Sequence, residues 1–335
     1  YSIMPNYQGV WSLSTQYQNR SGWPAPPTLP IGLFAGGINA SNTKLDNIDQ
    51  FNISTTGNAS NFGDLTATKR RITGCSSETR GIFTAGLAGA NNAFLNVIEF
   101  VTIASEGNGS DFGDLLYTER SPAACASATR GIVGGGYASA ENPSGEGNKT
   151  DVIQYITIAS AGNATDFGNL VQKRDDLAAF SSTTRGIFSG GGFEGYRNEI
   201  DFITIASTGN ASDFGDLTVG RNDLSGCASP TRGLSFGGYL SSGWSDVIDY
   251  ITIASAGNAT DFGNLIDSNF RQASACSSHT RGVNCGGSMP TALGSATDVI
   301  QYVTIASTGN ASDFGDLTDS KAFGAACSAT HRGIA

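Results

Sequence analysis

Few side chains in this sequence could carry acid–base, nucleophilic or metal chemistry. The 335 residues include only two histidines, His279 and His331, and both sit in the same repeated turn beside an arginine. The motifs of zinc peptidases, serine hydrolases and phosphate-binding loops do not occur. We therefore expect no catalytic residues, no metal ligands and no cofactor, and predict that the chain is not an enzyme.

The charge balance also restricts the partners. The formal net charge is −10, and charged residues make up 14% of the chain. Nucleic-acid binding depends on clustered Lys and Arg, so no nucleic-acid partner is expected. Nowhere does the sequence approach the roughly 18 uninterrupted apolar residues of a membrane-spanning helix, so no membrane insertion is expected.

An internal repeat of about 50 residues dominates the sequence. The phrase at residues 57–65, GNASNFGDL, has six versions, which begin at Gly57, Gly107, Gly162, Gly209, Gly257 and Gly309. A second phrase runs in step with it, an Arg-Gly pair followed by apolar residues and glycines, at Arg80, Arg130, Arg185, Arg232, Arg281 and Arg332. Such self-similarity is typical of repeat architectures.

Each unit contains four short segments with the composition of β-strands. In one unit these segments are residues 224–228, 234–236, 247–253 and 262–265. β-Branched and aromatic residues dominate the third segment, and turn formers flank it. Glycine is too frequent for helices, and no helical apolar period appears. The sequence predicts an all-β fold, a six-bladed β-propeller with four-stranded blades.

The unit resembles the kelch repeat. Gly237-Gly238 follow the second strand, Tyr250 lies in the third, Phe262 comes further on, and Arg221 occupies the basic position of the preceding unit. Kelch units usually have Trp where this chain has Phe. The resemblance covers about residues 31–335, with repeats at approximately 32–80, 81–130, 131–185, 186–232, 233–281 and 282–335. It implies an architecture and no particular activity.

The ends of the chain predict how the ring closes. The first copy begins with a second strand at Ile31, and the last copy supplies a first strand at residues 323–327. Pairing these two segments in one blade would leave no free sheet edge. Residues 332–335 overlap a position that residues 32–35 already fill, and their packing stays open.

Several repeated positions predict the core. One position is always Ile (Ile53, Ile103, Ile158, Ile205, Ile253, Ile305), a second is always Phe (Phe62, Phe112, Phe167, Phe214, Phe262, Phe314), and Leu follows each Phe by three residues. Another position, expected on the innermost strand, holds Cys75, Cys125, Cys227, Cys276 and Cys327, with Phe180 in the remaining copy. We expect buried, reduced thiols, because equivalent positions of different blades do not meet disulfide geometry.

Repeated polar residues gather on one predicted face. The six arginines of the Arg-Gly pairs share it with Asp111, Asp166, Asp213, Asp261 and Asp313. We expect repeated arginine–carboxylate contacts there, with a ligand-binding ring of charge as the alternative. The Gly-Asn-Ala phrases, with Gly-Asn-Gly in the copy at residues 107–109, also form glycosylation sequons, which we interpret as turns. The sequons are at Asn58, Asn108, Asn163, Asn210, Asn258 and Asn310.

The loops after the Gly-Gly pairs differ among units and leave from the opposite face. A constant scaffold with variable loops is typical of binding proteins. Their aromatic, amide and charged side chains suit contact with a glycan or a protein. The predicted binding residues are Asn91, Asn92, Phe94, Glu141, Tyr196, Arg197, Trp244 and Met289. Sequence drift without function is the alternative explanation.

The near-identical units, such as ITIASTGNASDFGDLT at residues 203–218, resemble repeats in structural proteins of tailed bacteriophages, especially marine phages such as those of cyanobacteria. The segment at residues 7–17, followed by Trp23-Pro24, is similar to a stretch of their virion proteins. The resemblance implies a tail fibre, receptor-binding tip or capsid appendage, made in the host cytoplasm and present in multiple copies on the virion. It carries over no catalytic residues.

Residues 1–30 lack the repeat and are rich in Tyr, Trp, Gln and Pro. We predict an extended anchor to other virion proteins through Trp11, Tyr17 and Trp23. A strap folded against the propeller is the alternative. The predicted function is host-surface recognition by a non-enzymatic virion protein. Capsid or tail decoration without receptor binding is one alternative, and a glycan-acting propeller enzyme is the other.

Overall fold

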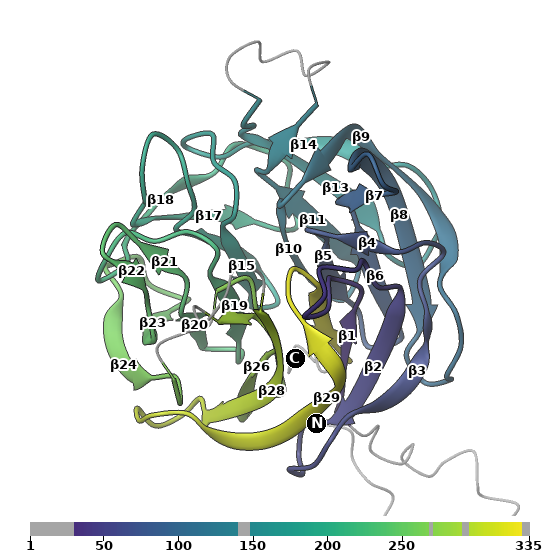
Figure 1. Cartoon of the computed structure of the whole chain (residues 1–335). Coiled ribbons are helices and arrows are strands. Elements are labelled where there is room, and N and C mark those ends of the chain that lie inside the picture. Colours follow the sequence, from purple (N-terminus) through teal and green to yellow (C-terminus); the bar gives the residue numbers. More distant parts are fainter. Residues whose placement is uncertain (1–29, 140–147, 268–270, 290–294, 330–335) are drawn as a thin grey trace, which may run out of the picture.

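The computed structural model describes residues 30–139, 148–267, 271–289 and 295–329, which form a β-propeller (Figure 1). Every helix or strand assigned within these ranges is a β-strand. Antiparallel sheets stand side by side around a central axis as blades, which confirms the predicted all-β propeller with four-stranded blades. No helix that could cross a membrane occurs in these ranges. The predicted anchor, including Trp11, Tyr17 and Trp23, lies outside them and stays a prediction.

The blades share one strand order. In one of them β19 (Ser225–Ala228) is innermost, followed outward by β20 (Arg232–Phe236), β23 (Val247–Thr252) and β24 (Thr260–Asn264). Two further sheets repeat this order: β10 (Ala123–Ala126), β11 (Arg130–Gly134), β13 (Val152–Thr157) and β14 (Thr165–Asn169); and β15 (Ala178–Ser181), β16 (Arg185–Ser189), β17 (Glu199–Thr204) and β18 (Ser212–Asp216).

Two larger sheets follow the same order and gain short strands from loops. One contains β5 (Thr73–Ser76), β6 (Arg80–Thr84), β8 (Ala93–Thr102) and β9 (Ser110–Arg120), with β4 (Lys69–Arg70), β7 (Leu87–Ala88) and β12 (Tyr137–Ala138). The other contains β25 (Ser274–Ser277), β26 (Arg281–Cys285), β28 (Ser295–Thr304) and β29 (Ser312–Lys321), with β27 (Ser288–Met289). A separate hairpin joins β21 (Tyr239–Leu240) to β22 (Gly243–Trp244).

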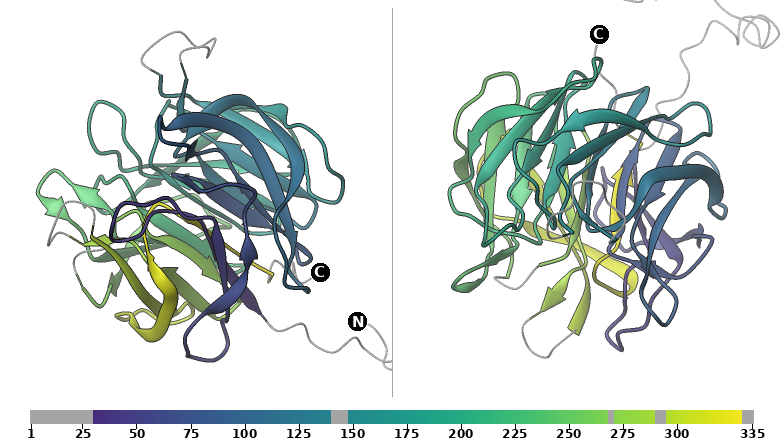
Figure 2. Two further views of the ribbon diagram at one scale, coloured as in Figure 1. Left: turned by 45° about the vertical axis from the view of Figure 1, so that its right-hand side comes forward. Right: turned by 90° about the horizontal axis from the view of Figure 1, so that it is seen from above.

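The two ends of the chain meet in one blade. β30 (Ala325–Ser328) is its innermost strand and pairs with β1 (Ile31–Ala35), which continues outward to β2 (Asn47–Asn52) and β3 (Ser60–Asp64). The predicted closure is therefore correct, and β1 and β30 stay side by side in each view (Figure 2). The innermost strands contact one another in a closed circle that runs β30, β5, β10, β15, β19, β25 and back to β30.

The predicted core positions are buried. None of the repeated Ile, Phe and Leu side chains is more than 5% exposed. Five of the outer-strand Phe rings, those of Phe112, Phe167, Phe214, Phe262 and Phe314, meet an aromatic ring of their own blade edge-on. In one such pair the ring centroids of Tyr250 and Phe262 are 6.0 Å apart. The cysteines of the inner strands are buried and free, as predicted.

The Cys or Phe side chain at the repeated inner-strand position packs against a glycine of the next blade. A Cβ atom added to Gly282 would lie 2.9 Å from the Cys227 sulfur, and one added to Gly131 would lie 3.1 Å from that of Cys75. Where the inner strand carries Phe180, a Cβ on Gly233 would lie 1.9 Å from its ring. The glycine of each Arg-Gly pair that the structure describes is therefore required by the neighbouring blade.

The repeated Gly-Asn-Ala turn docks on the outer strand of the preceding blade. Gly209 N–H donates to the carbonyl of Phe167 (2.8 Å), and Ala211 N–H donates to that of Asn169 (2.8 Å). In return, Asn169 N–H donates to Oδ1 of Asn210 (3.1 Å). The same three bonds occur at the chain closure, where Asp316 N–H donates to Asn58. These asparagines lie in turns, as predicted, and they also join blades. We call this set of bonds the blade lock.

The prediction of repeated arginine–carboxylate contacts is wrong. Arg185 places its guanidinium 4.8 Å from the ring centroid of Phe202 in its own blade, and Nη1 donates to the carbonyl of Ile253 in the next blade (2.9 Å). The same bond links Arg80 to Ile158, Arg130 to Ile205, Arg232 to Ile305 and Arg281 to Ile53. Carbonyl oxygens of the neighbouring turn are closer to these guanidinium groups than the repeated carboxylates. Arg332 lies outside the described residues.

At the end of the blades opposite the Arg-Gly turns, buried ion pairs join neighbouring blades. The pairs are Lys69–Glu99, Arg174–Asp201, Arg221–Asp249 and Lys321–Asp49, with N–O distances of 2.8 to 3.0 Å. Glutamine replaces the acid at two further positions. Gln154 donates to Glu119 (3.0 Å), and Gln301 accepts a hydrogen bond from the Ile266 N–H (2.9 Å). Burial raises the pKa of Glu119 to about 8, so this carboxyl group is largely protonated at neutral pH.

We predict that Asn210→Ala lowers the free energy of unfolding by about 1 kcal/mol, because it leaves the Asn169 N–H without its acceptor. Denaturant unfolding followed by circular dichroism measures this change. Asn210→Asp keeps an acceptor oxygen and is the matched control. An unaltered unfolding midpoint for Asn210→Ala would show that the side-chain bond of the blade lock does not contribute to stability.

Candidate binding site on the loop face

Two kinds of connection lie at the same end of the blades. The loop from β20 to β23 leaves there, and so does the segment that leads from β24 to the next inner strand, β25. The Arg-Gly turns and the blade locks lie at the other end. We call the first end the loop face, and those predicted binding residues that the structure describes belong to its loops.

Six residues surround the mouth of the central channel on the loop face. Each lies two residues before the first residue of an inner strand, and together they are Arg71, Ser121, Asp176, Asp223, Gln272 and Phe323. Their φ angles lie between 52° and 61°. Each N–H donates to the carbonyl of the preceding member, and Arg71 N–H closes the circle on Phe323 (2.8 Å). We call these residues the mouth ring.

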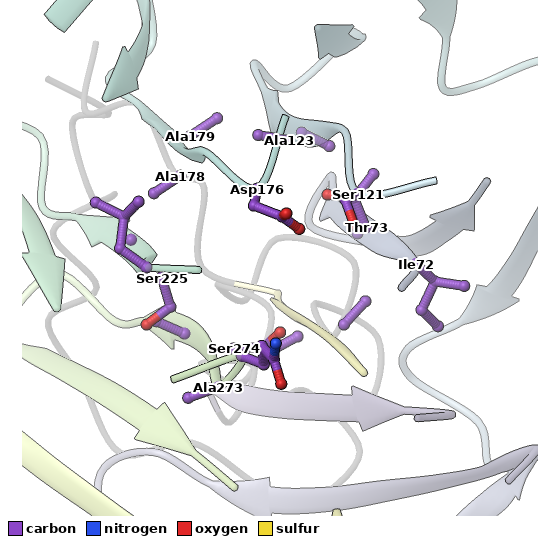
Figure 3. A pocket seen from close by; sticks show the side chains of 18 of the residues that line it. Ile72, Thr73, Ser121, Ala123, Asp176, Ala178, Ala179, Ser225, Ala273 and Ser274 are labelled. Atoms are coloured by element: carbon purple, nitrogen blue, oxygen red, sulfur yellow. The ribbon is translucent and has the colours of Figure 1, made fainter. Parts of the chain in front are cut away.

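The side chains of the mouth ring interact across the opening. Arg71 Nη1 donates to Ser121 Oγ and to Asp176 Oδ1, both at 3.0 Å, and its guanidinium lies 4.5 Å from the centroid of the Phe323 ring. Gln272 Nε2 donates to Asp223 Oδ2 (3.1 Å). All six line a cavity of about 110 Å³, and Figure 3 shows Ser121 and Asp176 around its opening.

Asp223 is the most perturbed carboxyl group of the mouth ring. Its side chain is 10% exposed. Burial and, to a lesser extent, the charge of Asp176 raise its pKa to about 7, against the opposing effects of Arg71, Arg271 and the hydrogen bond from Gln272. This carboxyl group therefore titrates near neutral pH.

Sequence reasoning missed the mouth ring. Its only signal is a fixed place two residues before each inner strand, because neither the ring residue nor its neighbours are constant among the units. The inner strands that follow, such as Ser225–Ala228, have small side chains, and we interpreted them only in terms of packing. Only the structure places these side chains around one opening.

The structure brings some of the predicted residues together over the β8–β9 blade. Phe94 stacks on Tyr137 with centroids 6.1 Å apart, and the Arg120 guanidinium lies 4.4 Å from the Tyr137 centroid. Asn92 accepts a hydrogen bond from Arg70 (3.3 Å), and Asn91 is exposed beside it. Arg70, Arg120 and Tyr137 were not predicted.

A second aromatic group lies on the loop face over the β15–β18 and β19–β24 blades. Tyr196 and Trp244 each have their ring centroid 5.8 Å from that of Tyr239, which lies between them and was not predicted. Arg271 lies 4.6 Å from the Trp244 ring. All four side chains are half-buried, so Tyr196 and Trp244 belong to a packed group that leaves part of each ring accessible.

The remaining predicted residues are Arg197, Met289 and Glu141. Arg197 approaches Glu199, with an N–O distance of 3.5 Å, and its guanidinium lies 5.5 Å from the Phe193 ring. Met289 belongs to β27. Glu141 lies outside the described residues. Among the residues that the structure describes, no group of three or more His, Cys, Asp or Glu could hold a metal ion.

Comparison with known proteins assigns no family. No protein-family model matches the sequence, and no curated protein matches it. The arrangement of side chains on the loop face is therefore the basis for any functional conclusion.

We predict that Asp223→Asn changes how stability depends on pH. The folded-state pKa of about 7 lies above the ordinary value near 4, so the parent loses stability as pH rises toward 7. Between pH 5 and pH 8 the variant should gain about 2 to 3 kcal/mol of unfolding free energy relative to the parent.

Denaturant titrations at several pH values measure this difference. Asp213→Asn, a change to an exposed carboxylate at the other end of the blades, is the matched control and should keep the parent's slope. A parallel pH dependence for Asp223→Asn and the parent would contradict a raised pKa at Asp223.

Proposed function

We propose that this chain is a non-enzymatic binding protein that recognises a host-surface glycan or protein with its loop face. One observation carries the proposal. The mouth ring holds one backbone conformation throughout, yet its side chains are Arg, Ser, Asp, Asp, Gln and Phe. A scaffold that repeats its backbone and varies its side chains at one opening favours recognition. The aromatic and arginine groups on the same face support this.

We further infer that the ring has six kelch-like blades. Six inner strands follow one another around the axis, and the blade lock recurs between successive blades, including those that hold the chain ends. A crystal structure of the full chain should have six similar blades about a pseudo-sixfold axis. A ring with five or seven blades would contradict this inference.

We propose that the chain is carried on a tailed-phage virion in multiple copies, attached through residues 1–30. The resemblance of its repeats to those of phage structural proteins supports this location. Decoration of the capsid or tail without receptor binding is the alternative. Antibody labelling of intact particles, viewed by electron microscopy, locates the chain, and labelling confined to a fibre tip would favour receptor binding.

On assembled particles, Tyr196→Ala with Trp244→Ala should reduce adsorption to host cells several-fold, because both rings lie on the proposed contact face. Thr208→Ala, in an exposed turn at the other end of the blades, is the control. The measurement is the rate at which particles disappear from the medium. Unchanged adsorption by intact variant particles would favour the decoration role.

The second alternative is a glycan-acting enzyme. Asp176 pairs with Arg71, whereas the pKa of Asp223 is raised to about 7, so two carboxyl groups at one opening differ in their environments. Glycoside hydrolases use pairs of carboxyl groups that differ in this way. Release of reducing sugar from host glycans, abolished by Asp223→Asn, would favour this alternative.

A further inference from the structure

The mouth ring carries side chains where its backbone disfavours them. All six members have a positive φ, a conformation that glycine adopts without strain and that is rare for other residues, above all for bulky ones such as Phe323. The chain has 45 glycines, and the neighbouring Gly-Gly pairs also have positive φ. Glycine is nevertheless absent from all six positions. Strained positions that keep their side chains cluster at functional sites.

Gln272 is the clearest sign that something binds in the mouth. Its side chain lines the cavity, and the residue is only 8% exposed. Nε2 is occupied by Asp223, but Oε1 is buried and has no hydrogen-bond partner among the described residues. Buried polar atoms are rarely left unsatisfied, so a free acceptor that borders a cavity favours a donor from a ligand.

The mouth combines donors and acceptors with balanced charge. Arg71 and Ser121 provide donors, whereas Gln272 and the two Asp provide acceptors. The positive charge of Arg71 is paired with Asp176, and Arg271 lies 3.9 Å from Asp223. A ligand with a full charge of either sign would therefore disrupt an existing pair. Neutral hydroxyl groups both donate and accept, and they match this set.

The size of the cavity limits how much of a ligand can enter. Its volume of about 110 Å³ corresponds to roughly four water molecules, which is less than a disaccharide occupies. A single terminal unit can place two or three hydroxyl groups there while the rest of the glycan stays outside.

We propose that the channel mouth binds the terminal neutral sugar unit of a glycan, with Gln272 Oε1 and Asp223 as acceptors for its hydroxyl groups and Arg71 and Ser121 as donors. This proposal rests on the binding role proposed above for the loop face, and it gives that role a ligand class. Most of the mouth ring is polar, so hydrogen bonds provide most of the specificity.

A second region of the loop face would suit a different ligand. Arg70 and Arg120 lie near Arg71, just outside the mouth, and Lys44 is close to Arg70. No ion pair to Arg70, Arg120 or Lys44 is found within the described ranges. An acidic sugar would bind over these residues, so the test must separate neutral from acidic ligands.

The test is ligand binding to the purified 335-residue chain, observed by saturation-transfer NMR and titration. The probes are the methyl glycosides of glucose, galactose, mannose and N-acetylglucosamine, with methyl glucuronide as the acidic probe. At least one neutral glycoside should bind with millimolar affinity. Gln272→Gly should weaken that binding about tenfold, which is the effect of losing one hydrogen bond from a buried acceptor.

The backbone of Gln272, with φ at 58°, suits glycine, so this variant should keep the fold. Glu194→Gly, at φ 50° in an exposed loop away from the mouth, is the matched control and should bind like the parent. Asp223→Asn is a second test variant with nearly unchanged shape, and weaker binding by it also supports the proposal.

Three results would overturn the proposal. One is that no neutral glycoside binds. Another is binding that neither Gln272→Gly nor Asp223→Asn alters. The third is a preference for methyl glucuronide that Arg70→Ala and Arg120→Ala abolish. If particles still need Tyr196 and Trp244 for adsorption while the mouth binds no neutral sugar, this inference fails and the proposed function stands.

Discussion

The blade lock is the interaction on which the rest of the structure depends. It joins each outer strand to the next turn through two backbone bonds and one asparagine side chain. The outer strand needs glycine where the turn approaches it, since a Cβ on Gly168 of β14 would lie 2.4 Å from the carbonyl oxygen of Gly209. Contact between blades therefore explains why the Gly-Asn-Ala phrase and the Phe-Gly that follows it vary so little among the units. These contacts occupy the far end of the blades, which leaves the loop face free to vary.

The loop face keeps a regular backbone under irregular side chains. Backbone hydrogen bonds close the mouth ring, and its six residues share one backbone conformation. The positions of the six side chains are therefore set by the backbone and do not depend on the residue type. Below it, ion pairs such as Arg221–Asp249 hold the connections between blades. Rigid support of this kind lets single side chains determine which ligand fits, because little conformational entropy is lost when a ligand binds.

The sequence predicted what depends on the unit alone. Strand order, the buried Ile and Phe positions, the free cysteines and the pairing of β1 with β30 all follow from a repeat that must close. Contacts between units were harder to predict. The partner of Arg185 is a carbonyl group because the next blade brings Ile253 within 2.9 Å, a distance that no spacing in the chain encodes. Asp223 and Gln272 were not predicted because they occupy a position whose residue type differs among the units, whereas a repeat is recognised by the residues that stay the same.

The pairing of β30 with β1 has a consequence for the order of the chain. That blade is held by the same kinds of contact as the others, including a blade lock from Asn58 to Asp316. The ring is therefore closed by non-covalent contacts between blades, and this closure does not depend on the order in which the chain connects the units. A chain with its ends in another loop would present the same interfaces in the same succession. The position of the termini is thus independent of the contacts that close the ring.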